Sequence, residues 1–156
     1  MDTMPIHIVI LGSIPEAILI VWAGLNLMGV RPDRKKVVFI GILQGISSYF
    51  IRRHLDFGPH IIAQVILLIL YTYLIIRVKW VTAIAAISLS FVIVILVEGS
   101  LIILGGMNTV HILSMEWKRL LVLLPHDFVL GYIGYVSSKK DICLWDEVNL
   151  SHFREE

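Results

Sequence analysis

Long apolar runs, separated by short charged or turn-forming segments, limit the fold of this sequence more than any other feature. Five such runs cover residues 6–30, 37–51, 60–76, 80–104 and 119–136. An apolar run of about 18 residues or more is typical of a helix that crosses a lipid bilayer. The hydrophobic share of 58% and the mean hydropathy of +0.87 exceed what a soluble fold of 156 residues can bury.

The apolar runs are predicted to be helices, because they lack strict apolar–polar alternation and exceed the roughly ten residues of a barrel strand. A helix also satisfies its own backbone hydrogen bonds inside a bilayer. We therefore expect an all-α integral membrane protein, with about five transmembrane helices in one bundle over residues 1–136 and a short cytoplasmic tail over 137–156. The stretch 107–118 is too polar to span, and either lies in the interface or belongs to another span.

Composition and motifs exclude several functional classes. The net charge of +1 and the scattered basic residues exclude a nucleic-acid partner, and the single cysteine, Cys143, excludes an internal disulfide framework. No pattern of a serine hydrolase, zinc hydrolase, phosphate-binding loop or dinucleotide-binding fold occurs. We therefore expect no enzymatic activity, no cofactor and no metal site.

Orientation in the membrane follows from the lysine and arginine residues, which concentrate on the cytoplasmic side. With five spans, one side carries nine such residues and the other carries four. The first set is Arg31, Arg34, Lys35, Lys36, Arg77, Lys79, Lys139, Lys140 and Arg154, and the second is Arg52, Arg53, Lys118 and Arg119. We expect a multi-pass protein of the cell membrane with its N-terminus outside and its C-terminus in the cytoplasm.

Six polar residues are predicted to lie within the spans, in the central-to-outer part of the bundle. They are candidates for ligand binding or for coupling between helices: Glu16, Gln44, Gln64, Glu98, His126 and Asp127. A carboxylate near the bilayer centre costs about 2.5–3.5 kcal/mol or more, so it should face the bundle interior. Ionisable groups at such depth are functional candidates by default.

Each candidate also has a purely structural interpretation. Glu16, beside Pro15, could form an interhelical hydrogen bond to Gln44 or His126. The preferred interpretation of Gln44 and Gln64 is interhelical hydrogen bonding. For Glu98 it is an ion pair with Arg52 or Arg53. His126 and Asp127 could form a proton-responsive pair, because histidine titrates near neutral pH, or a hydrogen-bond network at a helix break beside Pro125.

Small residues at four-residue spacing predict close helix packing. They are Gly41 and Gly45 in the second run, and Ala86 and Ser90 in the fourth. Packing within the chain is the first interpretation, and homo-oligomerisation through the same faces is the second.

A series of motifs resembles a known family. Pro15-Glu16, Gly29-x-x-Pro32 with following lysines, Gln44, Tyr49-Phe50-Ile51-Arg52 and Phe57-Gly58-x-His60 occur in this order. The order resembles the N-terminal membrane sensor region of GHKL-type sensor histidine kinases from Gram-positive bacteria, relatives of the peptide-quorum sensor kinases. The resemblance covers about residues 6–140. It implies a sensor region without the kinase domains, and hence no phosphoryl transfer.

Three functions remain open. The first is a stand-alone membrane sensory or regulatory module that signals to a histidine kinase or another membrane or cytoplasmic partner. The second is a small transporter or ion-pathway component, with Glu16, Gln44 and His126 along a polar route. The third is a structural assembly protein, in which every polar group serves helix packing.

Overall fold

The computed structural model describes residues 12–54, 59–104 and 116–140, and every regular element in these ranges is helical. The order is α2 (Ile14–Leu27), α3 (Arg34–His54), α4 (Pro59–Tyr71), the π-helix η2 (Thr72–Ile76), α5 (Trp80–Leu104) and α7 (Glu116–Lys140). Because η2 directly continues α4, these elements form five helical rods. The expected all-helical fold is thus confirmed for the described residues. Parts of the predicted first span, interfacial stretch and tail, residues 6–11, 107–115 and 141–156, lie outside them.

Several helix ends differ from the apolar runs. α3 extends beyond the run 37–51 by a basic turn at each end. α7 runs from Glu116 to Lys140, so the end of the expected interfacial stretch and the start of the expected tail are helical. Hydropathy marks only the apolar part of a helix, whereas lysine, arginine and glutamate are good helix formers and let the helix continue.

The end of α2 is set by Gly29 rather than by polarity. Gly29 has a φ of 76°, a left-handed conformation that glycine adopts without steric cost. Its amide donates to the carbonyl of Asn26 at 3.0 Å, and the amide of Val30 donates to the carbonyl of Leu25 at 2.9 Å. These two bonds form a Schellman motif, which closes the helix at Leu27, before the end of the apolar run.

The turn between η2 and α5 depends on Arg77. This residue has a φ of 63°, and its amide donates to the carbonyl of Tyr73 at 3.1 Å. Just before it, the hydroxyl of the fully buried Thr72 donates to the carbonyl of Leu68 at 2.7 Å. The chain then reverses within three residues and begins α5 at Trp80.

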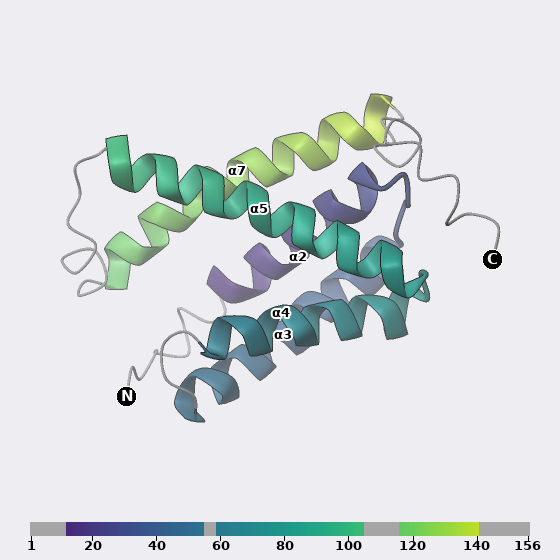
Figure 1. Ribbon diagram of the computed structural model, residues 1–156, viewed down its shortest axis with the longest axis horizontal. Coiled ribbons are helices and arrows are strands. Elements are labelled where there is room, and N and C mark those ends of the chain that lie inside the picture. The colour runs from purple at the N-terminus through teal and green to yellow at the C-terminus, as the bar shows by residue number, and fades with distance from the viewer. Residues whose placement is uncertain (1–11, 55–58, 105–115, 141–156) are drawn as a thin grey trace.

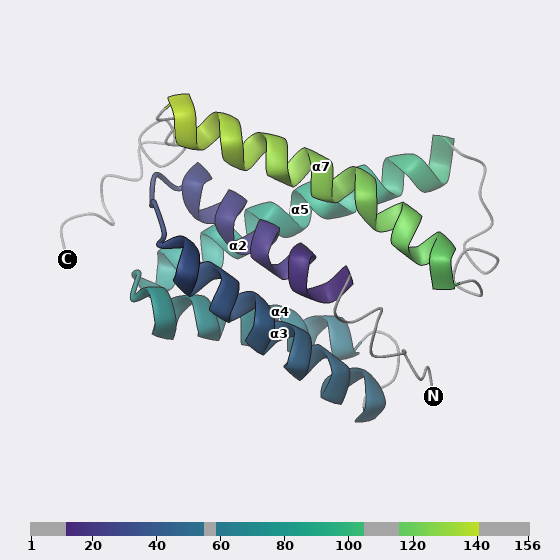
Figure 2. The ribbon, with the colours of Figure 1, turned by 180° about the vertical axis from the view of Figure 1, so that it is seen from behind.

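The helix α2 is the centre of the bundle. Figures 1 and 2 show it between the pair α3–α4 on one side and the pair α5–α7 on the other. Successive rods run in opposite directions, so α2 begins at the same end of the bundle at which α3 and α5 finish and α4 and α7 begin. We call this the near end, at the left of Figure 1, and the opposite end the far end.

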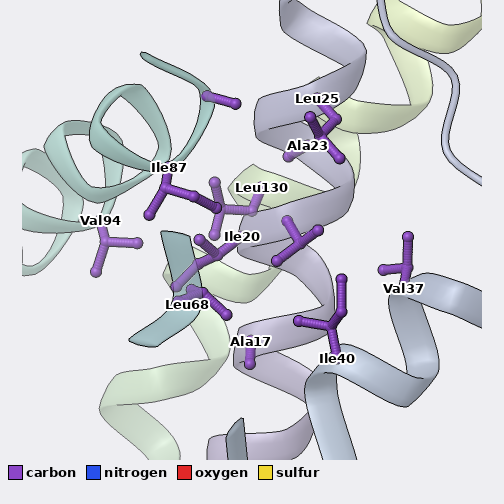
Figure 3. Packing of buried hydrophobic residues seen from close by; sticks show 12 residues of the cluster. Ala17, Ile20, Ala23, Leu25, Val37, Ile40, Leu68, Ile87, Val94 and Leu130 are labelled. Atoms are coloured by element: carbon purple, nitrogen blue, oxygen red, sulfur yellow. The ribbon is translucent and has the colours of Figure 1, made fainter. Parts of the chain in front are cut away.

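The apolar core surrounds α2 (Figure 3). Ile20, Val21 and Leu25 of α2 are at most 2% exposed. They belong to one cluster that includes residues from every other rod: Val37, Ile40, Leu68, Ala86, Ile87, Val94 and Leu130. Burial of each large aliphatic side chain contributes about 1.5–3 kcal/mol when water is the alternative environment.

The outer faces of the rods are apolar as well. The described side chains of α3, α4, α5 and α7 include many large exposed hydrophobic ones, among them Phe39, Ile46, Ile62, Ile66, Ile95, Leu96, Phe128 and Tyr132. Two described helical segments are long and apolar enough to cross a membrane: Pro59–Ile76, with a hydropathy of 2.0, and Trp80–Leu101, with 2.6. Ile14–Leu27 is apolar but shorter.

Candidate functional site

Four ionisable side chains from three helices meet toward the near end of the bundle. Glu16 lies in the first turn of α2, and Glu98 lies in the last turns of α5. His126 and Asp127 lie in α7, directly after Pro125, and the helix continues through this proline. We call Glu16, Glu98, His126 and Asp127 the acid–histidine cluster.

The imidazole of His126 is the centre of this cluster and is fully buried. Its Nδ1 lies 3.2 Å from Oε1 of Glu98. Its Nε2 lies 3.8 Å from Oε1 of Glu16 and 3.6 Å from Oδ1 of Asp127. Neither ring nitrogen makes an aligned hydrogen bond within the described residues, so these contacts act mainly between charges.

The acid–histidine cluster contains more acidic groups than basic ones. Three carboxylates surround one imidazole, and their side chains keep exposed fractions of 25% for Glu16, 35% for Glu98 and 18% for Asp127. Arg52, near the end of α3, adds a positive charge that acts on Glu16. A protonated imidazole attracts all three carboxylates, whereas a neutral one leaves them to repel each other. The protonation state of His126 therefore affects the packing of α2, α5 and α7.

A second polar group joins α3 to α4. The side-chain amide of Gln44 donates to the carbonyl of Gln64 at 3.0 Å, and the side-chain amide of Gln64 donates to the hydroxyl of Ser48 at 2.9 Å. The first bond fixes the orientation of the Gln44 amide, because a carbonyl can only accept. Oε1 of Gln44 is buried and has no hydrogen-bond partner within the described residues.

A cavity of about 30 Å³ lies beside these groups. Among the described residues, its wall has five polar members, Ser13, Glu16, Gln44, Ser48 and Gln64, and four apolar members, Ala17, Ile20, Leu68 and Phe91. A cavity of this size holds about one water molecule when it offers polar partners. We call it the polar cavity.

Glu16 belongs to both groups. Its carboxylate contacts His126 in the acid–histidine cluster, and Glu16 is also a wall residue of the polar cavity. The acid–histidine cluster and the polar cavity thus form one continuous region toward the near end, and this region contains all six residues that the sequence predicted as candidates. The partner that the structure shows for Glu98 is His126, whereas the sequence suggested Arg52 or Arg53. Two cavity residues, Ser13 and Ser48, were not predicted, because a lone serine in an apolar run carries little signal.

The predicted small residues lie at helix contacts. A Cβ on Gly24 of α2 would meet the backbone of Ala86 and the hydroxyl of Ser90 in α5. That hydroxyl donates to the carbonyl of Ile20 at 2.9 Å. Gly41 and Gly45 of α3 face Ile18 and Ile14 of α2, where a Cβ would also be too close. These contacts hold α2 tightly between α3 and α5, and so fix the position of Glu16.

No group of three or more histidine, cysteine, aspartate or glutamate residues has the arrangement of a metal site within the described part of the chain. Comparisons with known proteins identify no relative. No protein-family model matches this chain, and neither a curated protein nor a solved structure matches it.

Proposed function

We propose that this chain is a five-span membrane protein that acts as a sensory module, with the acid–histidine cluster as its responsive site. The contacts of His126 with carboxylates from α2, α5 and α7 carry this proposal. Desolvating these charges costs free energy that an apolar contact of similar volume would not cost. If the cluster served packing alone, apolar side chains would fill the same space at a lower cost in free energy. The presence of charged groups therefore favours a functional role.

The distribution of polarity supports the membrane part of the proposal. Large hydrophobic side chains are exposed on four of the rods, while His126, Thr72, Ser90 and Ser48 are at most 1% exposed. A soluble protein rarely exposes apolar patches larger than a few hundred Å², because water penalises them. A bilayer accepts this outer surface, and a helix of 21 residues such as α3 spans about 30 Å.

The distribution of charge and aromatic residues supports the orientation. The far end has the basic residues around Arg31, Arg77 and Lys139, so it is the cytoplasmic side of the proposal. Tyr73 and Trp80 also lie there, with ring centroids 5.3 Å apart, as expected for aromatic side chains at a membrane interface. The near end, with the acid–histidine cluster, then lies toward the outer side.

Helix α7 provides a physical link between the two ends. It contains His126 near its middle, and farther along the hydroxyl of the buried Ser137 donates to the carbonyl of Asn26 at 2.9 Å. In the next residue, the carbonyl of Ser138 accepts a hydrogen bond from Arg31 at 3.1 Å. A ligand or proton with different affinities for two arrangements of the cluster would shift α7 and so change these far-end contacts.

The resemblance to histidine-kinase sensor regions supports a kinase as the partner. The test is a tagged protein in its native host membrane, crosslinked through Lys139 and Lys140 and analysed for bound kinases. We expect a histidine kinase whose autophosphorylation in reconstituted membranes differs between the wild type and His126→Gln. Absence of any cytoplasmic partner, or equal autophosphorylation with both variants, would contradict a sensory role.

A second function, a proton or cation pathway, has one specific observation in its favour. Glu16 joins the acid–histidine cluster to the polar cavity, so protonatable and hydrogen-bonding groups are continuous across α2. This function requires that protons or cations cross the membrane of liposomes that contain the protein. The substitution Glu16→Gln should remove that flux. Impermeable liposomes with wild-type protein would leave the sensory proposal as the better one.

A further inference from the structure

We propose that the polar cavity binds one exchangeable monovalent cation of the size of sodium. This inference deepens the proposed function, since it gives the responsive site a ligand. Two observations support it: Glu16 and Gln44 both line one small cavity, and Oε1 of Gln44 is buried with no hydrogen-bond partner among the described residues.

The charges near Glu16 leave room for one further positive charge. The acid–histidine cluster has three carboxylates, and the cations that act on Glu16 are Arg52 and, when protonated, His126. When all three carboxylates are ionised, the described residues around Glu16 are one positive charge short of neutrality. Helix α4 supplies Gln64 and Leu68 to the cavity wall, and both are uncharged. An uncompensated charge inside a membrane is costly, so a bound cation beside Glu16 is stabilised.

The chemistry of the cavity wall fits a hard monovalent cation. Carboxylate, amide and hydroxyl oxygens are the ligands that hard cations take from proteins. Glu16, Gln44, Ser13 and Ser48 supply all three kinds of oxygen. Gln44 is 5% exposed, and its Oε1 has no donor within the described part of the chain, so a cation would satisfy a buried acceptor that otherwise costs about 1–3 kcal/mol.

The volume of the cavity is compatible with a small ion. A volume of about 30 Å³ accommodates one particle of the size of water. A bare sodium ion fits, whereas N-methylglucamine is far too large. A transition metal is not favoured, because the wall residues within the described part of the chain include no imidazole or thiolate.

The experiment measures the thermal unfolding midpoint of the full chain in lipid nanodiscs at pH 8, in sodium chloride or in N-methylglucamine chloride of equal ionic strength. We expect a saturable increase of the midpoint with sodium only. A midpoint that is equal in both salts, or that changes with pH but not with sodium, would overturn the proposal, because a proton on Glu16 would then supply the missing charge.

A matched pair of variants tests the location. Ser48→Ala removes a hydroxyl from the cavity wall, whereas Ser47→Ala removes the neighbouring hydroxyl, which contacts Tyr71 outside the cavity wall. We expect the apparent sodium affinity to fall at least tenfold in Ser48→Ala and Gln44→Met, and to remain unchanged in Ser47→Ala. Equal sodium affinity in Ser48→Ala, Gln44→Met and Ser47→Ala would show that sodium does not bind in the polar cavity, and would overturn the proposal. A sensory protein without sodium dependence would still show the His126-dependent kinase response, so the two proposals fail separately.

Discussion

Nδ1 of His126 in α7 lies 3.2 Å from Oε1 of Glu98 in α5, and the imidazole is completely buried. This contact joins two helices that are adjacent in the bundle, and Glu16 adds the central helix α2 to it. The arrangement places three carboxylates around one imidazole, so the positive charge of His126 determines whether these helices attract or repel each other there.

The first prediction concerns this charge. His126→Leu removes it and leaves the carboxylates without their common partner, so the free energy of unfolding should fall by about 1–3 kcal/mol. Adding Glu98→Gln should restore part of this loss, because it removes one repelling carboxylate. Denaturation in detergent micelles measures both effects. His54→Leu is the matched control, because His54 is exposed and its ring contacts the carbonyl of Phe50 in the same helix.

Additive effects of His126→Leu and Glu98→Gln, with a coupling energy of zero, would contradict a charge contact between the two residues.

The second prediction concerns helix packing at Gly24. Gly24→Ala places a methyl group against the backbone of Ala86, and the hydroxyl of Ser90 would lie 2.7 Å away. Overpacking of this kind costs about 1–3 kcal/mol. Gly99→Ala is the control, because a Cβ at Gly99 meets nothing within 4 Å. That substitution should be neutral or stabilising by about 0.5–1 kcal/mol, since alanine favours helices over glycine. Equal unfolding free energies for the two variants would show that α2 and α5 are not in close contact.

The third prediction concerns the link at the far end. Ser137→Ala removes the hydroxyl that donates to the carbonyl of Asn26, and should reduce the unfolding free energy by about 0.6 kcal/mol, the mean for interhelical hydrogen bonds in membrane proteins. It should also weaken any effect of His126→Gln on the partner kinase. Ser138→Ala keeps the carbonyl that Arg31 contacts and should change neither quantity. A full His126 response in Ser137→Ala would show that the signal does not pass through this contact.

The sequence predicted the helices and the region of the site better than the individual contacts. Counting along each apolar run placed Glu16, Glu98 and His126 in the central-to-outer part of the bundle, because helical rise is constant. It could not show which side chains face each other, since that depends on how each helix is rotated about its axis. Hence the contact of Glu98 with His126 was missed.

The helix ends differ from the apolar runs for two physical reasons. Hydropathy detects the apolar part of a helix, but backbone hydrogen bonds continue through residues of any polarity that tolerate helical geometry. α7 therefore includes residues that were assigned to the tail, and among them Ser137 is buried at 3% exposure. Conversely, α2 ends early because Gly29 adopts a positive φ, which hydropathy does not detect.

The most direct test of the five-span account uses the single cysteine, Cys143, three residues beyond the end of α7. Intact cells are treated with a membrane-impermeant maleimide before and after permeabilisation. A Thr3→Cys/Cys143→Ser variant reports on the opposite side of the membrane. We predict that Cys143 is labelled only after permeabilisation, and that the cysteine at position 3 is labelled in intact cells. Labelling of both positions in intact cells, or recovery of the protein in the soluble fraction, would contradict the account.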